Sequence, residues 1–592
     1  MRELKQGSQF YPRVRKDFSQ RDWFFRTLLQ AAEASRRAGD KTEHSAEQDS
    51  DSHMSQSGGL SPDQRALHVL NRLSFGPGPG DIDYVRRIGV ETWIERQLHP
   101  GSIPEPPALR ERIASLQTLR MTPVELFIQY QIPLRQLPAG EDKTAGRQRS
   151  RIILQQALQA RILRAVEGPR QLQEVMTAFW FNHFNVFAGK GLCHWWLGSF
   201  EQEAIRPYAM GRFRELLGAT AKHPAMLFYL DNWQNTAPNS PGARGKFEGV
   251  NENYARELME LHTLGVNGGY SQADVIALAH ILTGWGLMRR NAAIAMNRPA
   301  RRGAFVTTGI PVRRFIFARS GRDPRRWEMD GEFKTGDGFY FDARRHDFAA
   351  QIFLGQRIPG GGLEQGERAL DILARSPATA NHLSYQLAQY FIADDPPPAL
   401  VQRMARRYLE TDGNIREVFQ ALFSSTEFWD RRYYGVKFKT PYEFVISATR
   451  AAGVPVVNIR PLAGAMVQLG MPLYGCQTPD GYKQTQEAWL SPDAMMMRLS
   501  FATALGAGSL PLQRPMDEFA RDEGGGTHEG AMRPAVMRMP PAAVEAPVAP
   551  DPATLAVTVG DLLSPRTLDA IQAAPPRLRA PLILGSPEFM MR

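Results

Sequence analysis

Residues 251–285 read NENYARELMELHTLGVNGGYSQADVIALAHILTGW, and this stretch contains two helical patterns separated by a glycine-rich turn. In the first pattern, over 251–263, apolar side chains recur three and four residues apart, which is the period of an α-helix. The glycines of 265–269 then end this helix, and Ser271 followed three residues later by Asp274 is typical of a new helix start. The stretch therefore predicts a helix, a turn and a second helix.

The first of these helices carries a polar face with two glutamates, Glu257 and Glu260. Carboxylates three residues apart could bind a hard cation or act as an acid and base pair. Arg256, however, lies four residues from both Glu252 and Glu260, and this spacing also describes an ordinary row of surface ion pairs. Both interpretations stay open. His262 points away from the polar face, so it cannot join Glu260 as a metal ligand on this helix.

The second helix has a polar start and an apolar face. Asp274 is interpreted as a capping residue rather than a catalyst, because it follows Ser271 by three residues. His280 lies off the apolar face. We expect this helix to end at Gly284 and Trp285 to fill a cleft between helices.

Helix starts of one kind recur along the chain: Ser or Thr precedes Pro, and an acidic residue soon follows. They occur at Ser61-Pro62, Thr122-Pro123, Thr440-Pro441 and Ser491-Pro492. Glu125 and Glu443 each stand three residues after the threonine, which predicts two capping boxes. The fold class predicted is mainly α, a large multi-helix globular domain. Short aromatic runs at 315–317 and 338–341 predict a small β-hairpin excursion from it.

The composition divides the chain into four parts. Residues 1–60 are polar and mixed in charge, which predicts a flexible arm. Residues 61–510 form the main helical domain, with the basic loop and hairpin at about 289–345. Residues 511–552 are rich in Pro, Gly and Met and predict a linker, whereas 553–592 regain apolar spacing and are expected to dock on the main domain as helices.

The net charge of +10 is concentrated between Arg289 and Arg345, where about 14 basic residues stand against about 6 acidic ones. Its arginine pairs could bind an anionic surface or polymer. The candidate anion-binding residues are Arg313, Arg314, Arg325, Arg326, Arg344 and Arg345. Few aromatic side chains stand between them for base stacking, so nucleic acid is not expected as the ligand. A solvated basic loop is the alternative interpretation.

Cysteine content and apolar runs limit the class of protein further. Cys193 and Cys476 are too few for a disulfide framework and lack the spacing of a metal site, although one bridge stays open if the protein is exported. No run of about 18 apolar residues predicts a membrane-spanning helix. The first residues lack the apolar centre of a secretory signal. We therefore expect a cytoplasmic protein, or a periplasmic or extracellular one if the start site is misassigned.

Several segments form a set that marks a known family. They are HVLNRLSFG at 68–76, FWFNHF at 179–184, NENYARELMELHTLG at 251–265, TGW at 283–285, His346-Asp347, and KTPYEF at 439–444. From about residue 62 onward the chain resembles the bacterial domain of unknown function 1800 family. The resemblance implies a predominantly α-helical fold, frequent export, and genes placed beside those of an exported sulfatase- or phosphatase-like family. It implies no particular reaction.

His183 is the third candidate site residue. It follows apolar residues of 172–179 at helical spacings, so it should point into the core. A buried histidine needs partners for its ring nitrogens, and Glu257 or Glu260 would supply one if their face of the helix points inward. A core histidine satisfied by other groups is the alternative.

Two functions therefore stay open. The first is a binding or accessory protein that works with another protein or an anionic polymer, because no complete catalytic or nucleotide-binding motif is present. The second is a metal-assisted hydrolase in which His183, Glu257 and Glu260 act as catalytic groups or hold a divalent cation. His346-Asp347, expected at the start of a helix, could assist it.

Overall fold

The helix starts expected from the sequence are present in the computed structural model. At Thr122 and Thr440 the hydroxyl accepts the backbone N–H of the glutamate three residues later, and that glutamate accepts the backbone N–H of the threonine. Both capping boxes are therefore confirmed. Ser61 and Ser491 also cap their helices through side-chain oxygens. The structure describes residues 59–131, 144–245, 247–287, 338–514 and 548–592.

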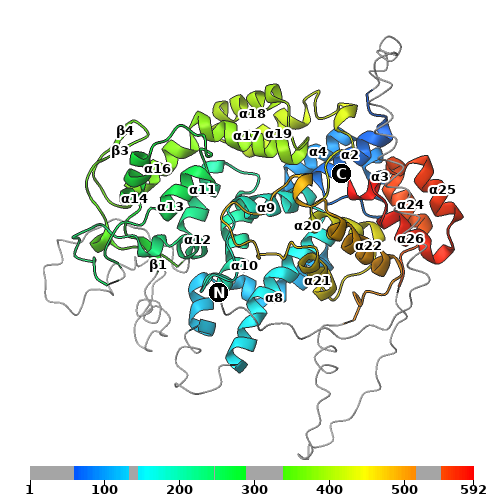
Figure 1. Cartoon of the computed structure of the whole chain (residues 1–592), viewed down its shortest axis with the longest axis horizontal. Coiled ribbons are helices and arrows are strands. Elements are labelled where there is room, and N and C mark those ends of the chain that lie inside the picture. The colour runs from blue at the N-terminus through cyan, green and yellow to red at the C-terminus, as the bar shows by residue number, and fades with distance from the viewer. Residues whose placement is uncertain (1–58, 132–143, 246, 288–337, 515–547) are drawn as a thin grey trace, which may run out of the picture. The chain divides into compact units, whose positions relative to one another are not determined.

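The described part of the chain is mainly α-helical, as the sequence predicts, and contains two antiparallel two-stranded sheets (Figure 1). The helices before residue 287 are α2 (Pro62–Leu73), α3 (Asp81–Ile88), α4 (Val90–Leu98), α5 (Pro107–Ala114), α6 (Pro123–Leu126), α8 (Thr144–Glu167), α9 (Gln171–His183), α10 (Leu197–Ser199), α11 (Phe213–Lys222), α12 (Pro224–Tyr229), α13 (Asn253–Glu260) and α14 (Gln272–Ile281). The later helices are α16 (Leu363–Ala374), α17 (Pro377–Phe391), α18 (Pro398–Glu410), α19 (Ile415–Phe423), α20 (Pro441–Ala452), α21 (Arg460–Gln468), α22 (Pro492–Gly506), α24 (Pro552–Val559), α25 (Pro565–Ala573) and α26 (Pro576–Leu584).

The first sheet joins two segments that are far apart in the sequence. Strand β1 (Trp285–Leu287) pairs with β2 (Phe339–Phe341), and Trp285 stands opposite Phe341. The aromatic run at 338–341 is therefore a strand, as expected, but its described partner is β1. The other expected run, 315–317, lies outside the described residues. Trp285 is fully buried, and its ring packs edge-on against Phe339.

A second hairpin, which the sequence did not indicate, follows the first sheet. Strands β3 (Gln351–Phe353) and β4 (Gln356–Ile358) are joined by a tight turn in which Leu354 and Gly355 have positive φ. The expectation that His346-Asp347 begins a helix is wrong. A short 3-10 turn, η10 (Ala343–Arg345), ends just before His346, whose backbone is extended.

The helix-turn-helix of 251–285 is present with shorter helices than expected. α13 ends at Glu260, and Gly265 and Gly269 adopt the positive φ that glycine tolerates best. Ser271 and Asp274 form a complete capping box, which confirms the capping role of Asp274. α14 ends at Ile281, three residues earlier than expected.

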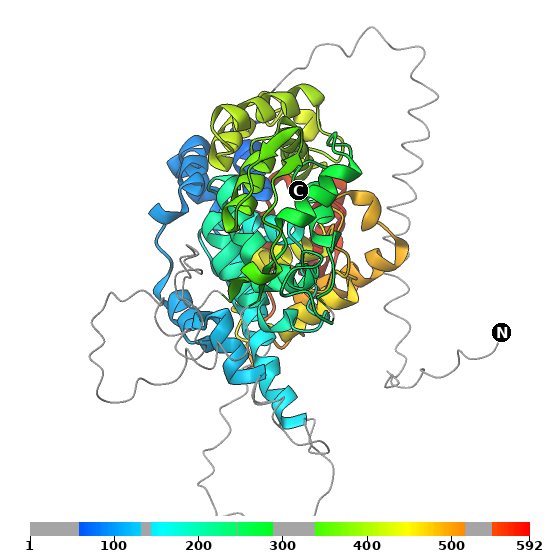
Figure 2. The ribbon, with the colours of Figure 1, turned by 90° about the vertical axis from the view of Figure 1, so that its left-hand side faces the viewer.

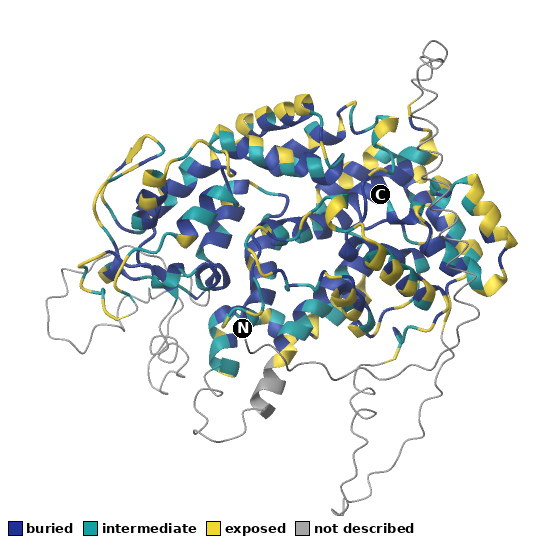
Figure 3. Cartoon of the chain, viewed as in Figure 1, coloured by how far each residue is buried: buried dark blue, intermediate teal, exposed yellow. Residues whose placement is uncertain are grey.

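α14 is the centre of a group of elements that carries most of the candidate residues. α13 and α16 both pack on it, and strand β3 lies along it. Figure 1 shows α13, α14, α16 and the β3–β4 hairpin gathered together, and Figure 2 turns this group toward the viewer. The hairpin is largely exposed, as its colour in Figure 3 shows, whereas the helices beneath it are largely buried.

Charged side chains are buried in the core, and one group of them surrounds Glu201. This residue lies in the π-helical turn η5 (Phe200–Ile205) and is fully buried. Its carboxylate is 3.2 Å from the guanidinium of Arg161 and 3.1 Å from that of Arg206, and it accepts a hydrogen bond from the Tyr474 hydroxyl at 2.9 Å. Arg206 also pairs with Glu174 on α9. The network thus joins α8, α9, η5 and the loop after α21.

A second buried group surrounds Glu443, the last residue of the Thr440 capping box. Its carboxylate accepts hydrogen bonds from the Tyr390 hydroxyl at 2.8 Å and from the backbone N–H of Thr440 at 2.8 Å. The guanidinium of Arg592 lies 3.1 Å from it. Burial by itself raises the pKa of Glu443, but Arg592 and these hydrogen bonds lower it below its usual value. Glu443 thus connects α20 with α17 and with Arg592.

Two further findings concern membrane-spanning helices and disulfide formation. No helix in the described ranges is long and apolar enough to cross a membrane. Cys193 and Cys476 are both buried and both free. The disulfide that the sequence left open is therefore not formed in this structure.

Replacing Glu443 by Gln should lower the free energy of unfolding by about 3–5 kcal/mol, because it leaves the buried charge of Arg592 without its counter-ion. Glu125→Gln is the matched control, since Glu125 completes the same capping box at an exposed position. We expect it to cost less than about 1 kcal/mol. Urea unfolding followed by circular dichroism measures both. Equal losses in the two variants would show that Glu443 acts only as a cap.

Candidate functional site

His183, the first predicted site residue, is buried at the end of α9, as its helical spacing predicts. Its Nε2 atom lies 3.1 Å from the backbone carbonyl oxygen of His262. The ring centroids of His262 and His382 are 6.0 and 6.5 Å from that of His183. Burial, with a smaller effect from His382, lowers the pKa of His183 to about 3. His183 is therefore a neutral histidine in a cluster of three.

Glu257 and Glu260 lie on the half-exposed face of α13, while Tyr254 and Leu258 occupy its buried face. Partial burial and the neighbouring carboxylate of Glu260 raise the pKa of Glu257. Burial raises the pKa of Tyr270, and the carboxylate of Glu260, which interacts with the Tyr270 hydroxyl, raises it further.

The sequence left open whether this face carries a row of surface ion pairs, and one such pair is present. The guanidinium of Arg256 lies 3.0 Å from the carboxylate of Glu252, one helical turn away. It also donates a hydrogen bond to the side chain of Gln272 at 3.0 Å. The polar face of α13 therefore contacts the start of α14.

The three residues of the predicted trio have different surroundings. His183 faces the core, whereas Glu257 and Glu260 stand on the outer face of α13. Within the part of the chain that the structure describes, no three His, Cys, Asp or Glu side chains are placed to hold a metal ion. The structure thus places His183 beside His262 and His382 in the core and the two glutamates on a half-exposed helix face, and a divalent cation held by Glu257, Glu260 and His183 stays a prediction.

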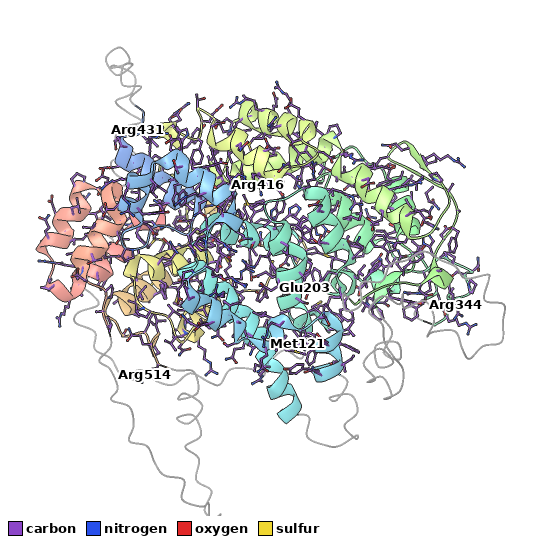
Figure 4. All side chains as sticks on the ribbon, turned by 180° about the vertical axis from the view of Figure 1, so that it is seen from behind. Met121, Glu203, Arg344, Arg416, Arg431 and Arg514 are labelled. Atoms are coloured by element: carbon purple, nitrogen blue, oxygen red, sulfur yellow. The ribbon has the colours of Figure 1, made fainter. Side chains whose placement is uncertain are left out.

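Two of the six candidate anion-binding arginines can be placed. Arg344 is exposed at the periphery of the molecule (Figure 4). Arg345 is buried, donates a hydrogen bond to the backbone carbonyl of Trp233 at 2.8 Å, and packs over the ring of Phe247. Arg345 thus stabilises the fold and is not available on the surface. Arg313, Arg314, Arg325 and Arg326 lie outside the described residues.

The structure brings together a different pair, His280 and Asp347, which are 67 residues apart in the sequence. Nδ1 of His280 lies 2.7 Å from the carboxylate of Asp347. The two side chains are 27% and 23% exposed, so the pair is neither buried in the core nor loose on the surface. Among the described residues, Nε2 of His280 has no hydrogen-bond partner. A histidine that is held at one nitrogen by a carboxylate and open at the other can accept and return a proton.

Thr283 fixes the backbone of both members of this pair. Its hydroxyl donates to the carbonyl of His280 at 2.6 Å and accepts the backbone N–H of Asp347 at 2.9 Å. The neighbouring His346 is buried, with Nδ1 2.8 Å from the carbonyl of Thr283 and Nε2 2.8 Å from the side-chain oxygen of Gln365. Thr283 of the TGW segment and the His346-Asp347 segment thus contact each other at one place in the fold.

The sequence contained part of the signal for this pair. His280 stands off the apolar face of its helix, and Asp347 belongs to a short segment of the resemblance. Each residue alone is an ordinary surface residue, and only the packing of α14 against the chain before β3 shows that they meet.

An open groove lies near the same elements, at the opposite end of β3. Its volume is about 550 Å³. Its walls come from the turn after α13, the β3–β4 turn and the junction of α16 with α17, and include Gly268, Gly269, Asp274, Gly355, Gln356 and Arg375. At the hairpin, the backbone N–H of Leu354 donates to the carboxylate of Asp274 at 2.7 Å. α14 therefore carries the groove at its first turn and His280 at its last.

A second, much smaller pocket lies between segments of the family resemblance. Phe179 and Asn182 from α9 line a cavity of about 40 Å³ together with Thr440, Tyr442 and other residues. This volume holds only a few water molecules. The side-chain amide of Asn182 is hydrogen-bonded to the backbone of Tyr482 in both directions. These segments therefore serve the packing of the core rather than a large ligand.

Comparison with known proteins identifies a family. The model of the family described as "Protein of unknown function (DUF1800)" matches residues 68–591. No curated protein and no solved structure matches the chain. The groove, the histidine cluster and the pair of His280 with Asp347 all lie within the matched range.

Stability should fall as the pH falls from about 6.5, the usual histidine pKa, toward 3. Burial lowers the pKa of His183, His68 and His223 to about 3, so across this window the unfolded chain binds more protons than the folded one. Each residue contributes up to about 1.4 kcal/mol per pH unit. Urea midpoints at pH 7 and pH 5 measure the slope. His183→Gln should reduce it and His99→Gln, at an exposed position, should not; an unchanged slope in His183→Gln would contradict this account.

Proposed function

The chain belongs to the DUF1800 family, and from its geometry we propose that it is a binding or accessory protein that recognises another protein through the groove beside α14. The observation that carries this proposal is the groove itself. At about 550 Å³ it is large enough for several side chains of a partner, and it is open at the surface.

The lining of the groove suits a polypeptide. Gly268, Gly269 and Gly355 line the groove, and a side chain built at Gly269 or Gly355 would meet no atom within 4 Å, so a partner backbone can approach these two residues closely. These features support recognition of an extended protein segment.

The charges around the groove argue against an anionic polymer as its ligand. The guanidinium of Arg375 lies 3.1 Å from the carboxylate of Asp412, and Asp371 lies 2.5 Å from Arg214. Asp274 adds a negative charge to the wall. A polyanion would meet these carboxylates without a free cluster of cations. A protein partner is therefore the stronger proposal.

We name one class of partner to test. The family resemblance implies genes placed beside those of an exported sulfatase- or phosphatase-like family. A protein of that kind, encoded beside this chain, is therefore the first candidate partner. A shared location outside the cytoplasm is part of the same proposal. The metal-assisted hydrolase with Glu257, Glu260 and His183 is the weaker proposal, because among the described residues no three His, Cys, Asp or Glu side chains are grouped to hold a metal ion.

Gln356→Trp should weaken binding of the neighbouring sulfatase- or phosphatase-like protein at least about tenfold in Kd, because the indole fills the groove. Arg357→Trp is the matched control: it is the next residue of β4, is exposed, and does not line the groove. Isothermal titration calorimetry with the two purified proteins measures both variants. No binding by the unaltered chain, or equal weakening by the two variants, would overturn the proposal for this partner and this groove.

A further inference from the structure

We propose that His280 and Asp347 form an acid–base catalytic site that activates water for the hydrolysis of a carboxylic ester. The proposal does not depend on the groove or on any partner. It rests on the geometry around α14 and on the open nitrogen of His280.

The first argument is that the carboxylate is held in place by groups other than His280. One oxygen of Asp347 accepts the backbone N–H of Ala349 at 2.9 Å. The other lies 2.7 Å from Nδ1 of His280 and 3.4 Å from the side-chain amide of Gln351. A carboxylate fixed in this way orients the imidazole and stabilises its positive charge during proton transfer.

The second argument is that the two backbones are connected. The Thr283 hydroxyl donates to the carbonyl of His280 within the end of α14 and accepts the N–H of Asp347, so the 342–347 segment cannot leave this end of the helix without losing the second bond. His346 adds contacts to Thr283 and Gln365 behind the pair. A simple surface ion pair needs no such support.

The third argument concerns the direction of proton transfer. With the Nδ1 proton directed at Asp347, Nε2 of a neutral His280 carries a lone pair and no described hydrogen-bond partner. The side chain is 27% exposed and Nε2 is not among the buried side-chain atoms that lack a partner, so water reaches this nitrogen. Nε2 is therefore the atom that acts as the base.

The chemical step balances with water as the only co-reactant. Nε2 removes a proton from water while the oxygen of that water forms a bond to the ester carbonyl carbon. The tetrahedral intermediate then breaks its bond to the alkoxy oxygen, which takes the proton from Nε2. The products are a carboxylic acid and an alcohol, and His280 returns to its starting state.

The surroundings favour a neutral ester over a phosphate ester. Ile276, one turn before His280 on α14, and Phe348, next to Asp347, are apolar side chains exposed by 40% and 47%. They offer contacts for an acyl group. Arg345, two residues before Asp347, is already bonded to Trp233 and packed on Phe247, which leaves the exposed Arg344 as the other arginine next to this segment. A phosphate would need cations or a metal ion to stabilise its charge.

The test measures hydrolysis of p-nitrophenyl acetate by the full chain. His280→Gln and Asp347→Asn should each lower the rate above buffer about 100-fold, the usual range for loss of a general base. His99→Gln is the matched control, because His99 is exposed and also pairs with a carboxylate, Glu95, at 3.1 Å. It should keep the full rate.

Three results would overturn the inference: no rate of the unaltered chain above that of His280→Gln, an equal loss in His99→Gln, or faster cleavage of p-nitrophenyl phosphate than of the acetate. A purely structural role of the pair predicts a different pattern. In that case both variants lower the melting temperature, measured by circular dichroism, and any loss of rate follows the loss of folded protein. For this reason we expect the rate to fall while at least the His280→Gln variant retains its helical signal at 25 °C.

Discussion

The fold depends on counter-ions for charges that have been removed from water. Glu443 and Glu201 are both buried; Glu443 pairs with Arg592, far away in the chain, and Glu201 pairs with Arg161 on α8 and with the nearby Arg206. A buried charge without a partner costs several kcal/mol, so the helices that carry these residues must stay together for the charges to be satisfied. Glu443 also completes the cap of α20, so the same carboxylate begins a helix and connects it to α17 and Arg592.

Polar contacts also hold α14 in its place. Thr283, His346 and Asp347 use short polar contacts to attach the end of this helix to the chain before β3. The hairpin is in turn attached at the first turn of α14 through Asp274. α14 is therefore held at both ends, and its two ends carry the two features with a proposed role, the groove and the open nitrogen of His280. A rigid helix keeps these features at a fixed separation.

Sequence patterns predicted the elements of this region well because their causes are local. The capping box of Ser271 and Asp274, the glycine turn after α13 and the inward direction of His183 all follow from the positions of residues within a few turns of helix. The error at His346-Asp347 has the same origin. Asp347 is interpreted from the sequence as the acidic residue of a first helical turn, but long-range bonds to Thr283 and Gln365 keep His346 extended.

The sequence by itself determined the helical class, the family, the capping residues and the buried or polar face of each helix, since these depend on periodicity and on contacts three or four residues apart. Only the tertiary structure decided which faces meet. It placed His183 beside two other histidines, buried Arg345 in the core, and brought His280 to Asp347 across 67 residues. The physical reason is that helical spacing fixes the direction of a side chain relative to its own axis, whereas the partner it reaches depends on how the apolar faces of separate helices pack and on which buried charges must be neutralised.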